Sequence, residues 1–304
     1  MIIAIDHGNK QIKTIHKAYT SGLSEKDSRP AIGQEILHFN GKYYSLSDNR
    51  IPYMENKTVN ERFYILTLFA IAYEIEAAGC YQPGTIIHVQ LPVGLPPAHY
   101  GAQYEAFEKY FMKGHTENFS FRGKPYSIYI NEAIAYPQAY AAAMTVHSQI
   151  RSFKTMVIDI GGFTTDYMPF KSGGTAKSDC DSIENGVIHF YNKVISQVNS
   201  DWNRLLDESD VDTILMGEAS PFEDNIKRAV MESAQLFIND LFGILRERMI
   251  DLRSWKTVFV GGGSILFKNQ IIASGKVSDP IFIDDIAANA RGYELLYRAS
   301  KIRR

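Results

Sequence analysis

The sequence has few cysteines, no long hydrophobic run and no excess of charge of either sign. Its two cysteines, Cys80 and Cys180, show neither metal-ligand nor redox spacing. Two thiols make no disulfide framework in a chain of this size, so we expect a reducing, cytoplasmic setting. The longest apolar stretch, Ile65 to Tyr73, is interrupted by Thr67 and is far too short to span a membrane.

The net charge of −2 and the pI near 6.5 give no global electrostatic reason to bind nucleic acid or an anionic membrane. The first residues read as a strand, without the pattern of a signal peptide. The basic tail from Lys301 to Arg304 is too short for an amphipathic anchor. We therefore expect no direct contact with nucleic acid or membrane, and any link to DNA would run through a partner. The length of 304 residues suits two domains.

Two short segments of similar construction stand out in this background. In Asp6 to Lys13 an apolar run ends at an aspartate, a glycine turns the chain, and an extended segment returns. Asp159 to Asp166 repeats this arrangement after the apolar run Thr155 to Ile158. One such turn is common, but two of the same construction predict two facing hairpins that grip phosphate. They indicate a nucleotide site in a cleft between two related domains.

The first hairpin has the groups that bind phosphate and magnesium. Backbone N–H groups of Gly8, Asn9 and Lys10 can point inward as an anion-binding nest. Lys13 on the return strand can place an ammonium group beside a phosphate, and Asp6 can hold Mg²⁺ through water. The alternative is an ordinary N-terminal hairpin with a polar turn.

The second hairpin is the more specific of the two. Asp159 ends an apolar strand, where an uncompensated charge is costly and a metal with its hydration shell is a natural partner. Gly161 and Gly162 let the backbone approach a phosphate closely. Thr164 offers a hydroxyl, and Asp166 begins the return strand. The alternative is a Gly-Gly turn flanked by cross-strand pairs of β-branched residues.

Three further groups are weaker candidates. Gly261, Gly262 and Gly263 follow a strand, which suits close contact with an α-phosphate, ribose or base, although the motif is neither a Walker loop nor a dinucleotide fingerprint. Glu132 suits a water-orienting or general-base carboxylate, or else the polar first turn of a helix. Asp224, Lys227 and Arg228 share one helix face and could reach a ribose or adenine, or form a solvated, self-paired surface.

Apolar periodicity predicts the elements that carry these motifs. Helices are expected near residues 58–79, 97–112, 135–147, 182–198, 222–249 and 285–299. Strands are expected at 85–91, stopped by Pro92 and Gly94, at 255–260 and at 280–283, with a hairpin over 118–130 and an extended piece near 175–180.

Taken in order, these segments resemble the actin-like ATPase superfamily, which includes actin, bacterial filament-forming actins, heat-shock chaperone ATPases and sugar kinases. The resemblance covers essentially the whole chain. It implies an α/β, actin-like fold in which two related RNase H-like domains surround a nucleotide cleft. Domain I would comprise residues 1–140 and 285–304, with a small outer subdomain at about 20–57, and domain II residues 141–284. Residues 6–13 and 159–166 resemble the two phosphate hairpins, 261–264 the adenosine motif, and 131–143 and 287–294 the two connecting helices.

Within the superfamily, the chain looks most like the plasmid-segregating actins of the ParM/StbA type. The forms Asp-x-Gly-x-x-x-x-Lys, Asp-x-Gly-Gly-x-Thr-x-Asp and Asn-x-Arg-Gly (residues 289–292) carry this resemblance. It implies a cleft for Mg²⁺ with ATP or GTP, filaments that form with nucleotide and disassemble after hydrolysis, and an adaptor protein that joins filaments to plasmid or other replicon DNA. By position, the resemblance implies that Glu132 and Asp159 are catalytic and that Asp6 and Asp159 order Mg²⁺. It also implies that Gly186 contacts the nucleotide, together with the residues named above.

Two departures from the family pattern bear on assembly. The stretch between the first hairpin and the helix near Thr58 is short, which implies a reduced outer subdomain. His7 stands where an acidic or small polar residue is often found. Two other functions compete: a monomeric phosphotransferase of the sugar-kinase type, for which we find no acceptor site, and a membrane-associated scaffold, which the absent amphipathic tail disfavours.

Overall fold

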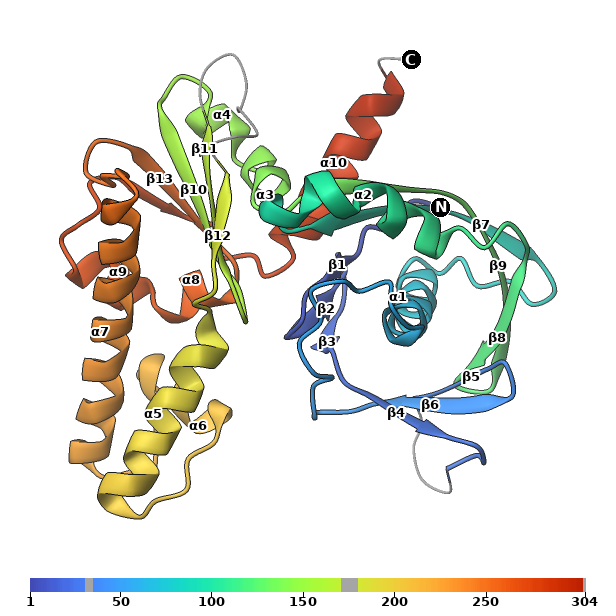
Figure 1. Ribbon diagram of the computed structural model, residues 1–304. Helices are drawn as coiled ribbons and strands as arrows, with labels where there is room; N and C mark the ends of the chain where they lie inside the picture. The colour runs from blue at the N-terminus through green and yellow to red at the C-terminus, as the bar shows by residue number, and fades with distance from the viewer. Residues whose placement is uncertain (31–34, 171–179, 303–304) are drawn as a thin grey trace. The chain divides into compact units, whose positions relative to one another are not determined.

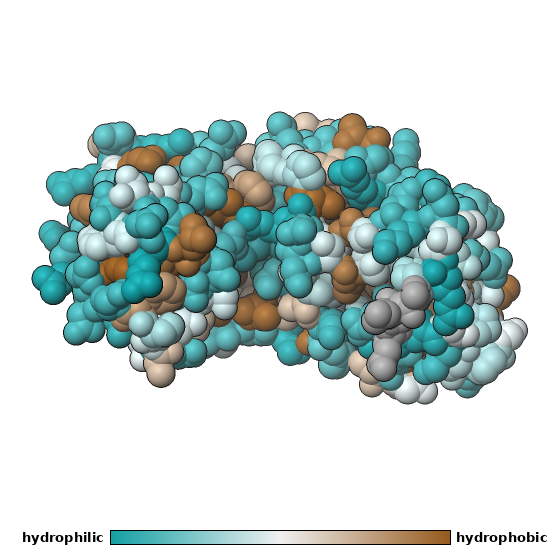
Figure 2. Space-filling model, turned by 90° about the horizontal axis from the view of Figure 1, so that it is seen from below, coloured by the Kyte–Doolittle hydropathy of each residue, from teal (hydrophilic) through white to brown (hydrophobic). Residues whose placement is uncertain are grey.

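The computed structural model describes residues 1–30, 35–170 and 180–302 (Figure 1). It divides into two compact units, one formed by Met1–Thr145 with Ala287–Arg304 and the other by Val146–Ile286. We call them unit 1 and unit 2. Each has its own hydrophobic core. The face shown in Figure 2 is mainly hydrophilic, with separate hydrophobic patches.

Unit 1 contains two sheets. One is three-stranded in the order β1-β2-β3, and the other is six-stranded in the order β4-β6-β5-β8-β9-β7. The N-terminal segment runs parallel to β7 through bridges from Ile2 to Gln90 and from Ile5 to Val93, and β7 is parallel to β9. Three neighbouring segments therefore have their carboxyl ends at the same edge. The strands are β1 (Asp6–His7), β2 (Gln11–Lys13), β3 (Ala18–Thr20), β4 (Leu23–Lys26), β5 (Ile36–Phe39), β6 (Lys42–Leu46), β7 (Ile86–Leu95), β8 (Glu117–Phe121) and β9 (Lys124–Pro137).

The helices of unit 1 are α1 (Arg62–Ala77), α2 (Pro97–Phe111), α3 (Tyr140–Met144) and α10 (Ala288–Ile302). α1 is apolar on all sides and almost wholly buried, as expected of a helix enclosed by sheets (Figure 1). α3 and α10 cross very closely, because a Cβ on Gly292 would lie only 1.9 Å from the Ala141 carbonyl oxygen. Only glycine permits this crossing.

Unit 2 is built on a five-stranded sheet in the order β12-β11-β10-β13-β14. β10 and β11 form an antiparallel hairpin, while β10, β13 and β14 run parallel. Parallel strands place their carboxyl ends at one edge, so the second candidate hairpin begins beside the end of β13. The strands are β10 (Thr155–Ile160), β11 (Thr165–Phe170), β12 (Asp181–Ile183), β13 (Lys256–Val260) and β14 (Pro280–Phe282).

The helices of unit 2 are α4 (His147–Ile150), α5 (Val187–Trp202), α6 (Glu208–Leu215), α7 (Asp224–Glu247), α8 (Gly262–Leu266) and α9 (Lys268–Ala273). In α7 the buried side chains recur at spacings of three and four, so one face packs on the core and the other meets solvent. Of the described residues, none belongs to a helix long and apolar enough to cross a membrane.

The helix predicted over residues 135–147 is wrong. β9 continues to Pro137, and the helix is reduced to the short α3. Tyr136 precedes a proline, which disfavours helical backbone at that position, and Ala139 has a positive φ of 59°. The Ala139 N–H is bound by the Asn289 side chain of α10 at 3.0 Å, which fixes the start of α3 after this residue.

The strand predicted to stop at Pro92 is also wrong, since β7 runs on to Leu95. The Pro92 carbonyl still accepts a hydrogen bond from Ile5 N at 3.0 Å, so this proline does not end the pairing. The helix expected from residue 182 begins only after Gly186, because β12 occupies the preceding residues. The extended piece expected near 175–180 lies mostly outside the described residues. The remaining expected helices and strands occur within a few residues of their predicted bounds.

Candidate functional site

The Asp6 carboxylate lies at the carboxyl end of the N-terminal segment and is almost completely buried. Its Oδ1 accepts a 2.8 Å hydrogen bond from Nε2 of Gln138, the residue that follows β9. In the β1–β2 ladder, Asp6 pairs with Lys13. Directly opposed residues have Cβ atoms about 5 Å apart. The structure therefore brings two of the predicted residues together and adds an amide that the sequence reasoning missed.

The turn between β1 and β2 is tightly fixed. A Cβ on Gly8 would lie 2.6 Å from the Gln11 carbonyl oxygen, so glycine is required there. The Gly8 carbonyl accepts from Ser21 Oγ at 2.5 Å, and the Lys10 carbonyl accepts from Ser21 N at 3.0 Å. Asn9 Oδ1 accepts from Met54 N at 3.3 Å. These contacts use carbonyl and side-chain groups of the turn, and the anion-binding role of its backbone N–H groups stays a prediction.

His7 is buried behind this turn and is held neutral. Its ring stacks on Phe111 at 5.0 Å between centroids, and its Nε2 is 2.8 Å from Thr67 Oγ1. Thr67 donates its single hydroxyl proton to the Phe63 carbonyl, so the His7 Nε2–H must donate to Thr67. Burial, followed by the nearby Lys57 charge, lowers the pKa of His7 to about 3. The residue that departs from the family pattern therefore anchors the hairpin to α1 and α2.

Glu132 lies elsewhere in unit 1. It is in the middle of β9, in register with Gln90, which in turn bridges to Ile2. Asp6 is four residues beyond Ile2, which is about 13 Å along an extended chain. The Glu132 carboxylate accepts from the Tyr297 hydroxyl and pairs with Lys301 Nζ at 2.5 Å. The helix-start alternative for Glu132 is wrong, because the residue is in a strand that is held to α10.

Two buried aspartates face each other in the second hairpin. Asp159 and Asp166 are directly opposed across β10 and β11, and both are almost completely buried. Asp166 Oδ1 accepts from Ser182 Oγ at 2.5 Å. Like charges at opposed positions destabilise a sheet, so a cation near the pair would be stabilising. The chemistry of this pair fits the magnesium role predicted for Asp159.

The turn of the second hairpin is joined to the start of α5. Gly161 N donates to the Thr164 carbonyl at 2.9 Å, which closes the turn. A Cβ on Gly186 would lie 2.5 Å from the Gly162 carbonyl oxygen. The first N–H groups of α5 donate to the Gly161 and Gly162 carbonyls at 3.0 and 2.8 Å. The first N–H groups of α5 and the Gly161 N–H are thus engaged within the protein.

The three glycines after β13 have different roles. Gly261 has φ of 88°, and a Cβ there would lie 2.2 Å from Asp159 Oδ1. A Cβ on Gly263 would lie 2.4 Å from Cγ2 of Ile160. Both glycines therefore let α8 pack closely against β10. A Cβ on Gly262 would meet no atom of the described structure within 4 Å, so it is the glycine that has space for a ligand.

Asp224 and Lys227 pair with each other at 3.6 Å in the first turn of α7, and Asp224 is 93% exposed. α7 reaches α9 at Gln235, whose Nε2 donates to the Gln270 carbonyl at 3.2 Å. That contact is about 16 Å along the helix from Asp224. Asp224 and Lys227 thus form the self-paired surface that the sequence analysis gave as the alternative to nucleotide contact.

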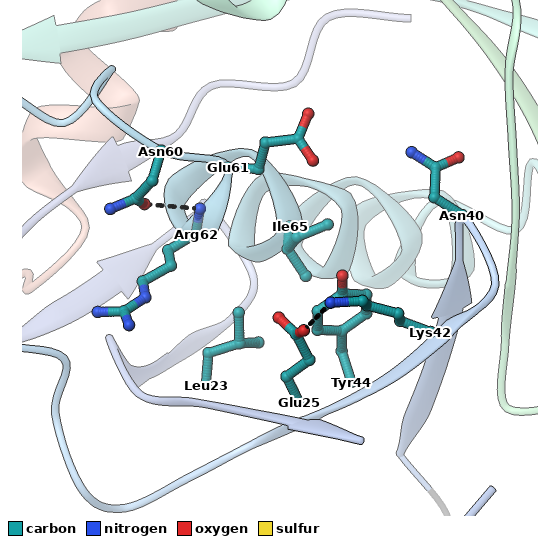
Figure 3. A pocket seen from close by; sticks show the side chains of 9 residues that line it. All are labelled: Leu23, Glu25, Asn40, Lys42, Tyr44, Asn60, Glu61, Arg62 and Ile65. Carbon is teal, nitrogen blue, oxygen red and sulfur yellow. Dashed lines mark hydrogen bonds and ion pairs between the residues drawn. The ribbon is translucent and has the colours of Figure 1, made fainter. Parts of the chain in front are cut away.

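No group of three or more His, Cys, Asp or Glu side chains that could hold a metal ion occurs within the described ranges. A pocket in unit 1 lies between the first turn of α1 and the strands β4 and β6 (Figure 3). Tyr44 and Ile65 line it, and an ion pair between Glu25 and Lys42 lies on the side formed by β4 and β6. None of the predicted site residues lines this pocket.

The chain is similar to actin homologues along its whole length. Residues 4–140 match the family described as actin like proteins N terminal domain, and residues 157–272 match the archaeal actin homologue MreB-like C-terminal family. No curated protein matches the sequence.

Solved structures give the same result for the fold. The apo psk41 ParM protein is 16% identical with a TM-score of 0.73, covering 99% of this chain and 98% of that one. The archaeal actin homolog Ta0583 in complex with ADP is 16% identical, with a TM-score of 0.74 and coverage of 98% and 99%. A 15-stranded ParM filament from Clostridium botulinum is 18% identical, again with a TM-score of 0.74 and coverage of 98% and 99%. The predicted actin-like α/β fold is confirmed.

Proposed function

Since this chain belongs to the actin-like superfamily, we propose that it is an ATPase whose nucleotide state controls its polymerisation into filaments. Two of the similar structures support the two parts of this proposal. One is an archaeal actin homolog in complex with ADP, and the other is a ParM filament. The ParM likeness further supports a role in segregating plasmid or other replicon DNA through an adaptor protein.

One observation carries the proposal: each unit ends a buried strand with an aspartate and follows it with a tight glycine turn. Asp6 and Asp159 are the two aspartates, and both are almost completely buried. A nucleoside triphosphate with Mg²⁺ suits these groups, because Mg²⁺ is usually held by one or two carboxylates, water and substrate phosphates. The open space at Gly262 suits the approach of a ligand to the backbone.

Each predicted residue has a proposed task. Asp6 and Asp159 hold the hydration shell of Mg²⁺, which when bound neutralises charge on the phosphates. Lys13 places its ammonium group beside a phosphate. The remaining contacts to phosphate or nucleoside come from Gly8, Asn9, Lys10, Gly162, Thr164 and Gly262. Asp166 supports Asp159, and Gly161, Gly186, Gly261 and Gly263 shape the backbone around the site.

We assign the orientation of the attacking water to Gln138 instead of Glu132. Gln138 Nε2 is fixed by its hydrogen bond to Asp6, so its Oε1 is positioned to accept a hydrogen bond from water. Water-orienting glutamines serve other phosphate-transfer enzymes in this way. Glu132, by contrast, is engaged by Tyr297 and Lys301 about 13 Å further back along the strands.

The proposal is tested by right-angle light scattering after addition of Mg-ATP, with phosphate release followed in parallel. We expect scattering to rise and then decay as phosphate appears. Repeating the experiment with GTP identifies the preferred nucleotide. Phosphate release with flat scattering at all protein concentrations would contradict filament formation, and a large stimulation of turnover by one sugar would favour the kinase alternative.

A further inference from the structure

Ser21 follows β3 directly and is completely buried. Its hydroxyl Oγ donates to the Gly8 carbonyl at 2.5 Å, and its backbone N–H donates to the Lys10 carbonyl at 3.0 Å. Gly8 and Lys10 both belong to the turn between β1 and β2. A single buried residue therefore holds two carbonyl groups of the first candidate hairpin on its own side of the turn.

The same two bonds set the direction of two N–H groups. In a trans peptide unit, the carbonyl and the N–H of the next residue point in opposite directions. The Gly8 carbonyl shares its peptide unit with the Asn9 N–H, and the Lys10 carbonyl shares its unit with the Gln11 N–H. Because both carbonyls point toward Ser21, both N–H groups point away from it. Backbone N–H groups that project from one side of a turn can together form an anion-binding concavity.

Ser21 is itself firmly held. Its carbonyl accepts a hydrogen bond from Ile51 N at 2.8 Å, which fastens it to the loop that follows β6. Two residues earlier, the buried Tyr19 hydroxyl donates to the Leu66 carbonyl at 2.6 Å and ties β3 to α1. The Ser21 hydroxyl is thus presented to the turn from a backbone that is fixed on both sides, as a group that orients another must be.

We propose that Ser21 is a positioning residue for phosphate binding. It holds the turn so that the N–H groups of Asn9 and Gln11 face the phosphates of a bound nucleotide, and it does not touch the nucleotide itself. Without the hydroxyl, the peptide unit between Gly8 and Asn9 is free to rotate, and the phosphate loses a fixed donor. The inference rests on the proposed nucleotide binding and names the residue that prepares one of its phosphate contacts.

Removal and replacement of the hydroxyl test this role. Ser21→Ala deletes the bond to Gly8 but keeps the backbone bond to Lys10. We expect it to weaken binding of Mg-ADP about tenfold, the size of effect expected for one misplaced hydrogen bond to a charged group. Ser21→Thr restores a hydroxyl at the same position and should bind within about threefold of wild type. Titration calorimetry measures the affinities.

Tyr19→Phe is the matched control. It removes a buried bond of the same kind, from a hydroxyl next to the hairpin to a backbone carbonyl, but its acceptor Leu66 belongs to α1 and not to the turn. The control should lower the melting temperature and leave the affinity for Mg-ADP within about twofold of wild type. An equal loss of affinity in Tyr19→Phe and Ser21→Ala would show that Ser21 acts only through stability, which would overturn the inference.

Two further outcomes separate this inference from the proposed function. Wild-type affinity in Ser21→Ala would overturn the positioning role and leave the proposed function intact. Wild-type protein that binds neither Mg-ADP nor Mg-ATP would overturn both.

Amide hydrogen exchange of the wild type, followed by NMR, keeps the test decisive if Ser21→Ala does not fold. The N–H groups of Asn9 and Gln11 should exchange about tenfold or more slowly with saturating Mg-ADP than without it, measured relative to the Ser21 N–H. The Ser21 N–H is the internal reference because it is already bonded to the Lys10 carbonyl. If nucleotide left the relative exchange of Asn9 and Gln11 unchanged, these groups would not face the phosphates and the inference would be overturned.

Discussion

Gln138 and Asp6, which are 132 residues apart in the chain, are joined by a 2.8 Å hydrogen bond from Nε2 to Oδ1. Register explains the meeting, because Ile5 bridges to Val93 and Val93 pairs with Ala135. Three parallel segments thus end together, with the carboxylate on the first and the amide directly after the third. This buried pair joins the first hairpin to the end of β9.

We predict that Gln138→Ala slows phosphate release about 10²-fold or more, as loss of a positioned polar group in an active site commonly does. Glu132→Ala should leave the rate nearly unchanged and cost about 1–3 kcal/mol of stability, because it removes the ion pair with Lys301 and leaves the Tyr297 hydroxyl without its acceptor. Phosphate release and binding of a fluorescent ATP analogue distinguish hydrolysis from binding. Filaments of the Gln138 variant should persist longer. If phosphate release is slow in the Glu132 variant and normal in the Gln138 variant, then Glu132 and not Gln138 has the catalytic role.

Asp159→Ala should abolish Mg²⁺-dependent hydrolysis without destabilising the nucleotide-free protein. The substitution removes one of two opposed carboxylates and so relieves their repulsion. This relief stabilises the protein by about 0.2–1 kcal/mol, which offsets the loss of the contacts that the Asp159 side chain makes. Thermal unfolding without metal and a magnesium titration of ATPase activity measure the two effects. Asp181→Ala, on the neighbouring strand and outside the site, is the control and should retain activity. Normal magnesium dependence in the Asp159 variant would remove that residue from the site.

The aspartate–glycine hairpins could be predicted because each is encoded within eight consecutive residues. The contact of Asp6 with Gln138 could not, since it depends on the register of strands distant in the sequence. The placement of Glu132 inside β9, and not at the start of a helix, depends on the same long-range register. An alanine-rich segment suggested a helix from residue 135, but the helix starts after Ala139, whose N–H is bound by Asn289 from 150 residues away. Local propensity was overridden there by tertiary contact.

The three glycines after β13 should respond differently to substitution. Gly261→Ala should lower the free energy of unfolding by about 1–3 kcal/mol, because φ is 88° and the new methyl group would meet Asp159. Gly262→Ala should leave the melting temperature nearly unchanged, since its Cβ would enter open space. If a nucleotide approaches there, as we propose, Gly262→Ala should weaken nucleotide binding. Calorimetric melting and nucleotide titration separate these effects, and an equal loss of stability in both variants would contradict the assigned roles.

Buried His7 predicts a specific dependence of stability on pH. Its pKa is lowered from 6.5 to about 3 in the folded protein, so as the pH falls the unfolded chain binds the proton first. The stability contributed by neutral His7 is therefore fully present above pH 6.5 and is lost progressively down to about pH 3. As the pH falls through this window, the free energy of unfolding of the wild type should decrease by up to about 1.4 kcal/mol per pH unit more than that of His7→Phe. The variant keeps the aromatic packing but has no imidazole to titrate.

Chemical unfolding at intervals between pH 7 and pH 4 measures the difference. Other acid-sensitive groups are common to both proteins, so they cancel in the comparison. His189→Phe is the matched control, because His189 is exposed on α5 and lies far from the hairpin in the sequence. Parallel pH curves for wild type and His7→Phe would show that His7 is accessible to protons in the folded protein, and its proposed anchoring of the hairpin would then have to be abandoned.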